Sequence, residues 1–323
     1  MHNINLSKYN LRTDLIIEND HILHEEKTEG NLTITKTKKS GNYITISFND
    51  ITDKDNEKEI ENITSKLIKE IIVKNKIESN ASCLVIGLGN LKSTPDSLGP
   101  KVLDNITITA HLFKVSKVDN TYRKVYAYKP DVMASTGIES ATSIKAIIEA
   151  IKPDFIIAID ALASRKLERI NKTIQITDTG IHPGSGIGNN RHEISKKTIG
   201  IPVIAIGIPT VVISSTIVYD TIEYLIKHIS YLKSHENTSK LTIKRTNYKQ
   251  KLMHNELTKE EKESLLGLIG SLNELDTRNL INEVLDNTEL NLIVTPTEID
   301  FLIDKLSKII ASSINKALLK DIY

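Results

Sequence analysis

Apolar and polar positions alternate near the start of the chain and then change to a helical spacing. Residues 31–36 and 42–48 carry apolar or β-branched side chains at every second position, a pattern that favours two antiparallel or edge strands. From Glu57 to Lys76 isoleucines and leucines recur at helical spacing, which predicts an amphipathic helix that packs on the following segments. We therefore expect strands and then a helix before the main core begins.

Continuous apolar runs replace this alternation in the middle of the chain. They occupy residues 83–88, 155–159 and 203–208, and helical patterns such as residues 140–151 separate them. Strands that are buried on both faces lose the polar alternation, and such strands are typical of parallel sheets covered by helices. We therefore predict an α/β fold with a mostly parallel sheet flanked by helices, whose core is residues 81–232.

The last third of the chain indicates a polar connection followed by helices. Residues 234–250 are predicted to be a linker or loop, and residues 258–323 a C-terminal helical extension. Thr258 and Thr295 each precede a glutamate by three residues, the spacing of a capping box, which predicts a helix start at each. The apolar stripe after Thr295 predicts that the last helix docks on the core.

Length, charge and cysteine content exclude several classes of protein. The chain has 323 residues, enough for one large domain or two modest ones. A net charge of +1 gives no field that attracts nucleic acid or acidic lipid. The single cysteine, Cys83, excludes a disulfide framework and fits a reducing cytosol. No segment has the pattern of a signal peptide or a membrane span, so neither export nor a membrane location is expected.

A glycine-containing turn follows the first apolar run. Gly87 and Gly89 match the beginning of a dinucleotide fingerprint, but Lys92 stands where the third glycine is needed. No phosphate-binding Gly-Lys-Ser/Thr sequence is present either. The turn is therefore expected to bring the backbone close to a ligand at the carboxyl end of a strand, with Gly89 and Asn90 as candidate substrate-binding residues.

Two aspartates near the ends of the apolar runs are the candidate catalytic pair. Asp96 also fits ordinary helix-start chemistry, as an acid in the first turn of a helix capped by Thr94. Asp160 also fits a cap of the next helix, or a partner of Arg165 or Arg169. Ligands of open α/β sheets bind at the carboxyl ends of strands, so both acids lie at that edge if their strands are neighbours. Such a pair can act on a water as acid and base.

A glycine-rich segment, residues 178–191, is a third candidate feature. Long glycine-rich loops are usually connectors, but loops at this edge of an α/β sheet often bind substrates. A lone loop histidine is more often only hydrogen-bonded than a base or a metal ligand. The candidate substrate-binding residues of this segment are His182, Gly184, Ser185 and Gly186.

Six long motifs carry a family resemblance that runs essentially end to end. They are residues 9–15, 88–100, 156–165, 174–189, 200–212 and 291–298. With these motifs the chain resembles the germination protease, or spore protease, family. The resemblance implies an unusual aspartic endopeptidase with a core similar to the hydrogenase maturation endopeptidases, and the family's two candidate catalytic aspartates fall on Asp96 and Asp160.

The resemblance also implies a substrate, an assembly and a location. The substrates are the small acid-soluble proteins that coat DNA in dormant spores and are cut during germination to release amino acids. The implied enzyme is a homotetramer in the cytoplasm of the forespore and the spore core. No cofactor, metal, direct nucleic-acid partner or membrane partner is expected.

The N-terminal motif implies a zymogen that processes itself. Family members remove a short N-terminal peptide at a site that resembles the substrate's, an acid followed by a bulky apolar residue, and Asp14 with Leu15 has that form. The resemblance therefore implies a propeptide of residues 1–14 and a single α/β protease domain of residues 15–323.

Two departures from the family pattern concern specificity. Where the family commonly has Pro-Gly-Val-Met-Gly, this chain has Asp131 and Ala134 in place of the two glycines. Where the family commonly has an acidic residue, this chain has Ile213. The first departure affects the geometry of a loop expected near the site rather than the reaction.

Two other functions fit part of the pattern. A hydrogenase-maturation-type, metal-dependent endopeptidase would use the same two carboxylates to hold a metal of its substrate, although the N-terminal segment and the C-terminal extension count against it. A catalytically silent binding module would use only the glycine-rich segment.

Overall fold

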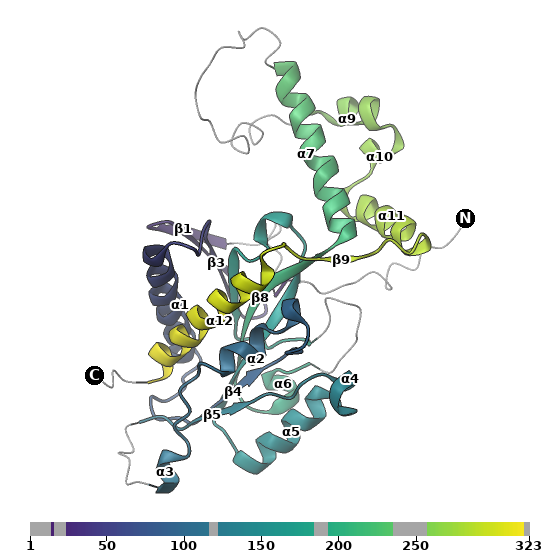
Figure 1. Ribbon diagram of the computed structural model, residues 1–323. Coiled ribbons are helices and arrows are strands. Elements are labelled where there is room, and N and C mark those ends of the chain that lie inside the picture. The colour runs from purple at the N-terminus through teal and green to yellow at the C-terminus, as the bar shows by residue number, and fades with distance from the viewer. Residues whose placement is uncertain (1–13, 16–23, 116–121, 184–192, 235–256, 320–323) are drawn as a thin grey trace. The chain divides into compact units, whose positions relative to one another are not determined.

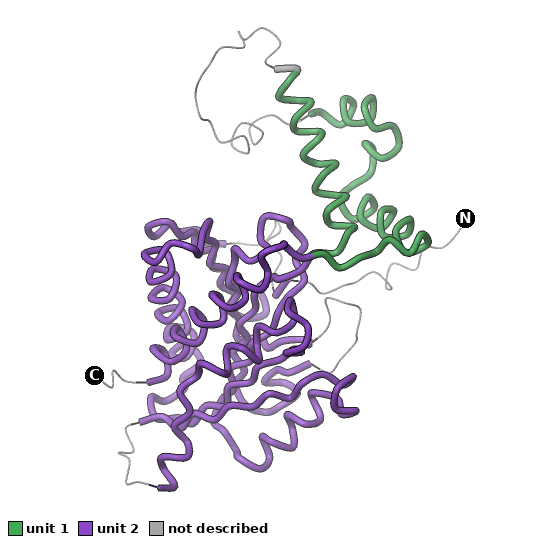
Figure 2. The backbone as a smooth tube through the Cα atoms, viewed as in Figure 1, with its two compact units in different colours: residues 1–10, 212–294 green, residues 11–211, 295–323 purple. Residues whose placement is uncertain are grey.

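The computed structural model of the chain contains two compact units. Unit 1 is Met1–Asn10 with Val212–Val294, and unit 2 is Leu11–Val211 with Thr295–Tyr323 (Figure 2). Residues 1–13 of the expected propeptide and residues 235–250 of the expected linker lie outside the part of the chain that the structure describes. The described residues are 14–15, 24–115, 122–183, 193–234 and 257–319.

Unit 2 is built on a sheet with the strand order β1-β2-β3-β7-β8-β6-β4-β5 (Figure 1). The three apolar runs form β4, β6 and β8, and the two alternating segments form β2 and β3, so these strand predictions are confirmed. The strands are β1 (His24–Glu29), β2 (Leu32–Lys38), β3 (Asn42–Ser47), β4 (Cys83–Gly87), β5 (Val125–Tyr128), β6 (Phe155–Ser164), β7 (Thr173–Thr177) and β8 (Val203–Ile213).

The sheet is mixed, which corrects the prediction of a mostly parallel sheet. β1, β2, β3, β7 and β8 form a series of antiparallel pairs, whereas β4 is parallel to β5 and β6. β8 runs in the same direction as β6, because the Ile156 N–H donates to the Pro202 carbonyl at the start of both strands and Leu162 lies beside Gly207 further along. The apolar runs predicted burial on both faces, and burial does not specify the direction of a strand.

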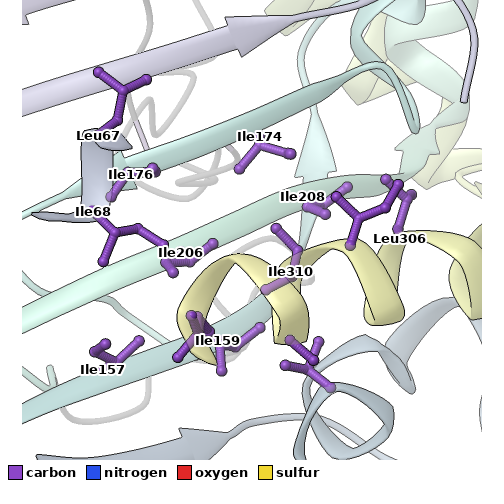
Figure 3. Close-up of a cluster of buried hydrophobic side chains, with 14 of the residues drawn as sticks. Leu67, Ile68, Ile157, Ile159, Ile174, Ile176, Ile206, Ile208, Leu306 and Ile310 are labelled. Atoms are coloured by element: carbon purple, nitrogen blue, oxygen red, sulfur yellow. The ribbon is translucent and has the colours of Figure 1, made fainter. Parts of the chain in front are cut away.

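One face of the sheet packs against α1 (Lys54–Lys74), α2 (Leu98–Leu103) and α12 (Ile299–Leu318). Figure 3 shows part of the cluster between the sheet and two of these helices, with Leu67 and Ile68 of α1 and Leu306 and Ile310 of α12. Because side chains alternate along a strand, the odd-numbered residues of β6 face this cluster. The labelled strand residues are Ile157, Ile159, Ile174, Ile176, Ile206 and Ile208.

The opposite face carries a second cluster, against which α5 (Ser140–Ile151) packs. Ile156, Ala158 and Leu162 belong to it, so the even-numbered side chains of β6, including Asp160, point to this face. The shorter elements of unit 2 are the 3-10 helices η2 (Thr94–Asp96) and η3 (Leu167–Arg169), and the helices α3 (Leu112–Val115), α4 (Met133–Thr136) and α6 (Lys196–Ile199).

The two predicted capping boxes have different outcomes. Thr258 caps α9 (Lys259–Leu266), with reciprocal hydrogen bonds between Thr258 and Glu261, so that prediction is confirmed. The prediction at Thr295 is wrong, because α12 begins after Glu298 without a side-chain cap. The Thr295 hydroxyl donates instead to the carbonyl of Thr210 at 3.0 Å, so a partner far along the chain replaces the local one.

The described part of unit 1 is mostly helical. Its elements are α7 (Ser214–Ser234), α9, α10 (Leu268–Ser271), α11 (Glu274–Asn287) and β9 (Ile293–Val294), which pairs with the last two residues of β8. Arg278 of α11 stacks on the ring of Tyr219 of α7 at 3.8 Å. The helices expose several large apolar side chains, among them Leu225, Leu232, Leu268, Leu275 and Val284. No helix among the described residues is long and apolar enough to cross a membrane.

Candidate active site

The turn after β4 folds back on the short helix that carries Asp96. Gly89 has a φ of +111°, and a Cβ at this position would overlap the carbonyl oxygen of Asp96. The Asn90 N–H donates to the same carbonyl at 3.0 Å. Only glycine fits both the backbone conformation and the close approach, so the glycine of the turn fixes the place of Asp96.

Asn90 has an evident structural role in this turn. Its side-chain oxygen accepts the N–H of Lys92 at 2.9 Å, and its carbonyl accepts the N–H of Ser93 at 3.0 Å. These bonds close the turn on itself. Binding of substrate by Gly89 and Asn90 stays a prediction.

The start of Asp96's helix differs from the prediction. Thr94 lies inside η2, whose cap is Ser93, and the cap makes no side-chain hydrogen bond. Thr94 is therefore not an N-cap, although Asp96 is an acid in the first turn of η2, as the helix-start interpretation expected. The half-buried Asp96 ends η2, two residues before α2 begins.

Asp160 lies inside β6 and is only 6% exposed. Its Oδ1 accepts the N–H of Ala161 at 2.9 Å. The strand residue before it, Ile159, lies beside β4, because the Leu88 N–H donates to the Ile159 carbonyl at 2.8 Å. Asp160 is therefore the residue after the one that accepts the hydrogen bond from the segment following β4.

Two contacts bring the segment of Asp96 close to this part of the sheet. A Cβ on Gly99, in the first turn of α2, would lie 2.8 Å from the Ile159 carbonyl oxygen and 2.6 Å from the Leu88 nitrogen. The Thr210 hydroxyl of β8 donates to the Pro95 carbonyl at 2.7 Å. The end of β4 and inner residues of β6 and β8 thus meet around η2, so η2 lies near the part of β6 that carries Asp160. Asp160 lies within β6 rather than after it, which corrects the prediction that it stands at the carboxyl end of its strand.

His182 lies beyond the end of β7 and contacts an acid. Its Nε2 is 3.6 Å from a carboxylate oxygen of Glu193, and both side chains are about one-third exposed. The neighbouring residues Ile181 and Ile194 form an isolated antiparallel bridge that holds the two ends of the segment together. Gly184, Ser185 and Gly186 lie outside the described residues, so substrate binding here stays a prediction.

The expected cleavage residue Asp14 is buried, with only 1% of its side chain exposed. Its Oδ2 accepts the N–H of Arg165 at 3.2 Å and lies 3.8 Å from the Arg169 guanidinium, and its Oδ1 accepts Nε2 of Gln175 at 3.3 Å. Burial raises the pKa of the Asp14 carboxyl, although Arg169 and the other partners lower it. Arg165 and Arg169, which the sequence suggested as partners of Asp160, both contact Asp14; their pairing with Asp160 stays a prediction.

The sequence did not single out Gln175. It lies at the centre of β7, is 1% exposed, and is an amide in an otherwise apolar and β-branched strand. A polar side chain at a buried strand position needs a hydrogen-bond partner, so a glutamine in such a strand is the sequence feature that could have marked Gln175 as a candidate.

Two further observations concern the cysteine and the possible metal ligands of the described residues. Cys83 is fully buried in β4, and burial raises the pKa of its thiol, which fits the predicted inert cysteine. Among the residues that the structure describes, no group of three or more His, Cys, Asp and Glu side chains is placed to hold a metal ion.

Comparison with known proteins gives matches over nearly the whole chain. Residues 10–323 match the sequence profile of a family described as Germination protease. A Germination protease of Bacillus cytotoxicus is 43% identical over 349 residues, which cover 98% of this chain and 95% of that protein. A Germination protease of Bacillus mycoides is 42% identical with the same coverage, and one of Bacillus anthracis is 41% identical over 350 residues.

Proposed function

This chain belongs to the germination protease family, and from that premise we propose that it is an aspartic endopeptidase in which Asp96 and Asp160 carry the chemistry. The observation that supports this pair is the approach of η2 to the part of β6 that carries Asp160, through the contacts of Gly99 with Ile159. A family of peptidases needs a group that activates water, and carboxylates such as these two can do so.

The proposed reaction is hydrolysis of a peptide bond. A water oxygen adds to the carbonyl carbon while one carboxylate takes a proton from the water. The other carboxyl group gives a proton to the amine nitrogen as the C–N bond breaks. The two roles together need one carboxylate ionised and the other protonated.

We propose the small acid-soluble proteins that protect spore DNA as the substrates. The matching family and proteins are named for germination. The resemblance of the six motifs to this family implies these substrates. The proposed place of action is the cytoplasm of the forespore and the spore core. The proposed enzyme is a zymogen that removes residues 1–14 itself by cleavage between Asp14 and Leu15.

Homotetramer formation is also part of the proposal. The helices of unit 1 expose large apolar side chains, such as Leu268 at 76% and Leu275 at 63%. Exposed apolar side chains in such number on one small unit are typical of a surface that packs against other subunits. The metal-dependent alternative is not favoured, because the family match runs through the N-terminal segment and the C-terminal helix that count against it.

Substitution of the two aspartates tests the catalytic assignment. The Asp96→Asn and Asp160→Asn variants are each expected to lower kcat/KM for a small acid-soluble spore protein by at least about a hundredfold, the effect of removing a general acid or base. Asp104→Asn is a matched control, because Asp104 is an exposed acid at the end of α2. Folded variants of both residues that cleave at the wild-type rate would exclude this pair.

A further inference from the structure

One side chain contacts both the acid and the peptide bond of the expected cleavage site. The Gln175 amide donates through Nε2 to the carboxylate of Asp14, and its Oε1 accepts the N–H of Leu15 at 2.7 Å. That N–H belongs to the bond between Asp14 and Leu15. Gln175 therefore contacts an acidic side chain and the peptide bond that follows it.

The contacts around Asp14 favour a carboxylate over an amide, although burial opposes its ionisation and raises its pKa. Donors approach both of its oxygens, from the Arg165 backbone and from Gln175, and the Arg169 guanidinium lies beside them. An ionised carboxylate accepts at both oxygens, whereas an amide has one acceptor and would turn its NH₂ group toward a donor. The Arg165 contact uses a backbone N–H, which keeps its place whatever side chain the residue carries.

This cleavage site lies on the face of the sheet that carries Asp160. Gln175 is the register partner of Gly207 in β8, and Leu162 of β6 lies beside Gly207. Leu162 and Asp160 are two residues apart in one strand, so their side chains share a face. Leu15 packs against the apolar cluster of that face.

We propose that Arg169, Gln175 and the Arg165 N–H form the specificity pocket for the acidic side chain that precedes the cleaved bond. The pocket takes Asp14 in the chain's own N-terminal segment and, once that segment has left, the equivalent acid of a substrate. An uncleaved chain is then blocked by its own residue 14. This inference rests on the proposed endopeptidase function.

A pair of peptides that differ only in Asp or Asn before an apolar residue tests the pocket. The processed enzyme is expected to cleave the Asp peptide roughly tenfold to a hundredfold better by kcat/KM, the range that a hydrogen bond to a charged group is worth. Arg169→Gln is expected to remove most of this preference by slowing cleavage of the Asp peptide. Gln175→Glu has the same shape and is expected to reverse it, because the Asn peptide can donate to Glu.

Arg123→Gln is the matched control. Arg123 is a buried arginine whose guanidinium donates to the carbonyls of Ala81 and Glu78, so its loss tests general destabilisation, and the preference for Asp is expected to survive. An enzyme that cleaves neither peptide nor any spore protein contradicts the proposed function itself. An active enzyme without the preference, or folded Arg169→Gln and Gln175→Glu variants that keep it, overturns the pocket alone. If Arg169→Gln does not fold, the isosteric Gln175→Glu variant decides.

Discussion

The backbone N–H of Leu15 donates a 2.7 Å hydrogen bond to the side chain of Gln175, 160 residues further along the chain. With the burial of Asp14 beside it, this bond holds the segment of the expected cleavage site on a defined part of the sheet. Its stability and its dependence on pH are therefore open to measurement.

Docking of residues 14 and 15 is expected to weaken as pH rises. The docked Asp14 has a raised pKa, chiefly because of burial, so docking binds protons. Docking is then strongest below the usual pKa of 3.8 and weakens as pH increases through the docked pKa. Hydrogen exchange of the Leu15 amide, measured against pH in full-length Asp160→Asn, reports this change. Asp14→Asn is the control and is expected to show no such dependence; stronger docking of the unsubstituted segment at higher pH would contradict the prediction.

Gly99→Ala is expected to lower both stability and activity. The added methyl group would overlap backbone atoms of Leu88, which follows β4, and of Ile159 in β6, and both residues are buried. We expect a loss of about 1–3 kcal/mol in the free energy of unfolding, as for other overpacked sites. We also expect a lower kcat, because α2 must shift and takes η2 with it. Denaturant unfolding and steady-state kinetics measure the two effects.

Gly200→Ala is the control for Gly99→Ala. Gly200 has a φ of +90° with nothing within 4 Å of an added Cβ, so alanine there costs about 1 kcal/mol of backbone strain. No change in kcat is expected at this remote helix end. An equal loss of kcat in both variants would show that stability alone explains the effect.

Asp131→Gly is expected to stabilise the chain, and Asp131→Ala to destabilise it. Asp131, at a position where the family commonly has glycine, has a φ of +58°. Its carboxylate accepts the N–H of Val132 at 2.7 Å, a local bond that helps an aspartate adopt this conformation. Glycine relieves strain of about 0.5–1 kcal/mol, whereas alanine keeps the strain and loses the bond. Thermal unfolding of both variants checks the order, and the reverse order would contradict the argument.

Cys83 is expected to stay unmodified in the folded enzyme. The thiol is fully buried and its pKa is raised, so little thiolate forms and reagents do not reach it. Alkylation by iodoacetamide at pH 8 should proceed only after addition of denaturant, and Cys83→Ala should keep full activity at a modest loss of stability. Rapid alkylation of the native enzyme, with loss of activity, would point to a nucleophilic cysteine instead.

Local sequence patterns predicted the elements better than their pairing. The runs that became β4, β6 and β8 were recognised because burial on both faces removes polar residues. The pattern does not specify the direction of a strand. β7 pairs antiparallel with both β3 and β8, which joins β1, β2 and β3 to the strands that the apolar runs form. At Thr295 a capping sequence was present, but the distant carbonyl of Thr210 took its hydroxyl.

The candidate site was predictable in part for the same reason. Asp160 could be chosen as a candidate because it directly follows a buried run, and Asp96 because it follows a turn that contains glycines. The partners of Asp14 could not be found from spacing, because Arg169 and Gln175 reach it only through the folded sheet. The signal that remained was an amide in a buried strand without a local partner.

Hydrolysis of the bond between Asp14 and Leu15 would change the electrical character of the place it occupies. The N–H that Gln175 accepts belongs to a neutral amide; after cleavage the same nitrogen is an α-ammonium, and residue 14 gains a second carboxylate. New charges are costly to keep in a site with so little access to water. Cleavage itself would therefore favour release of both new chain ends into solvent, where their charges are hydrated.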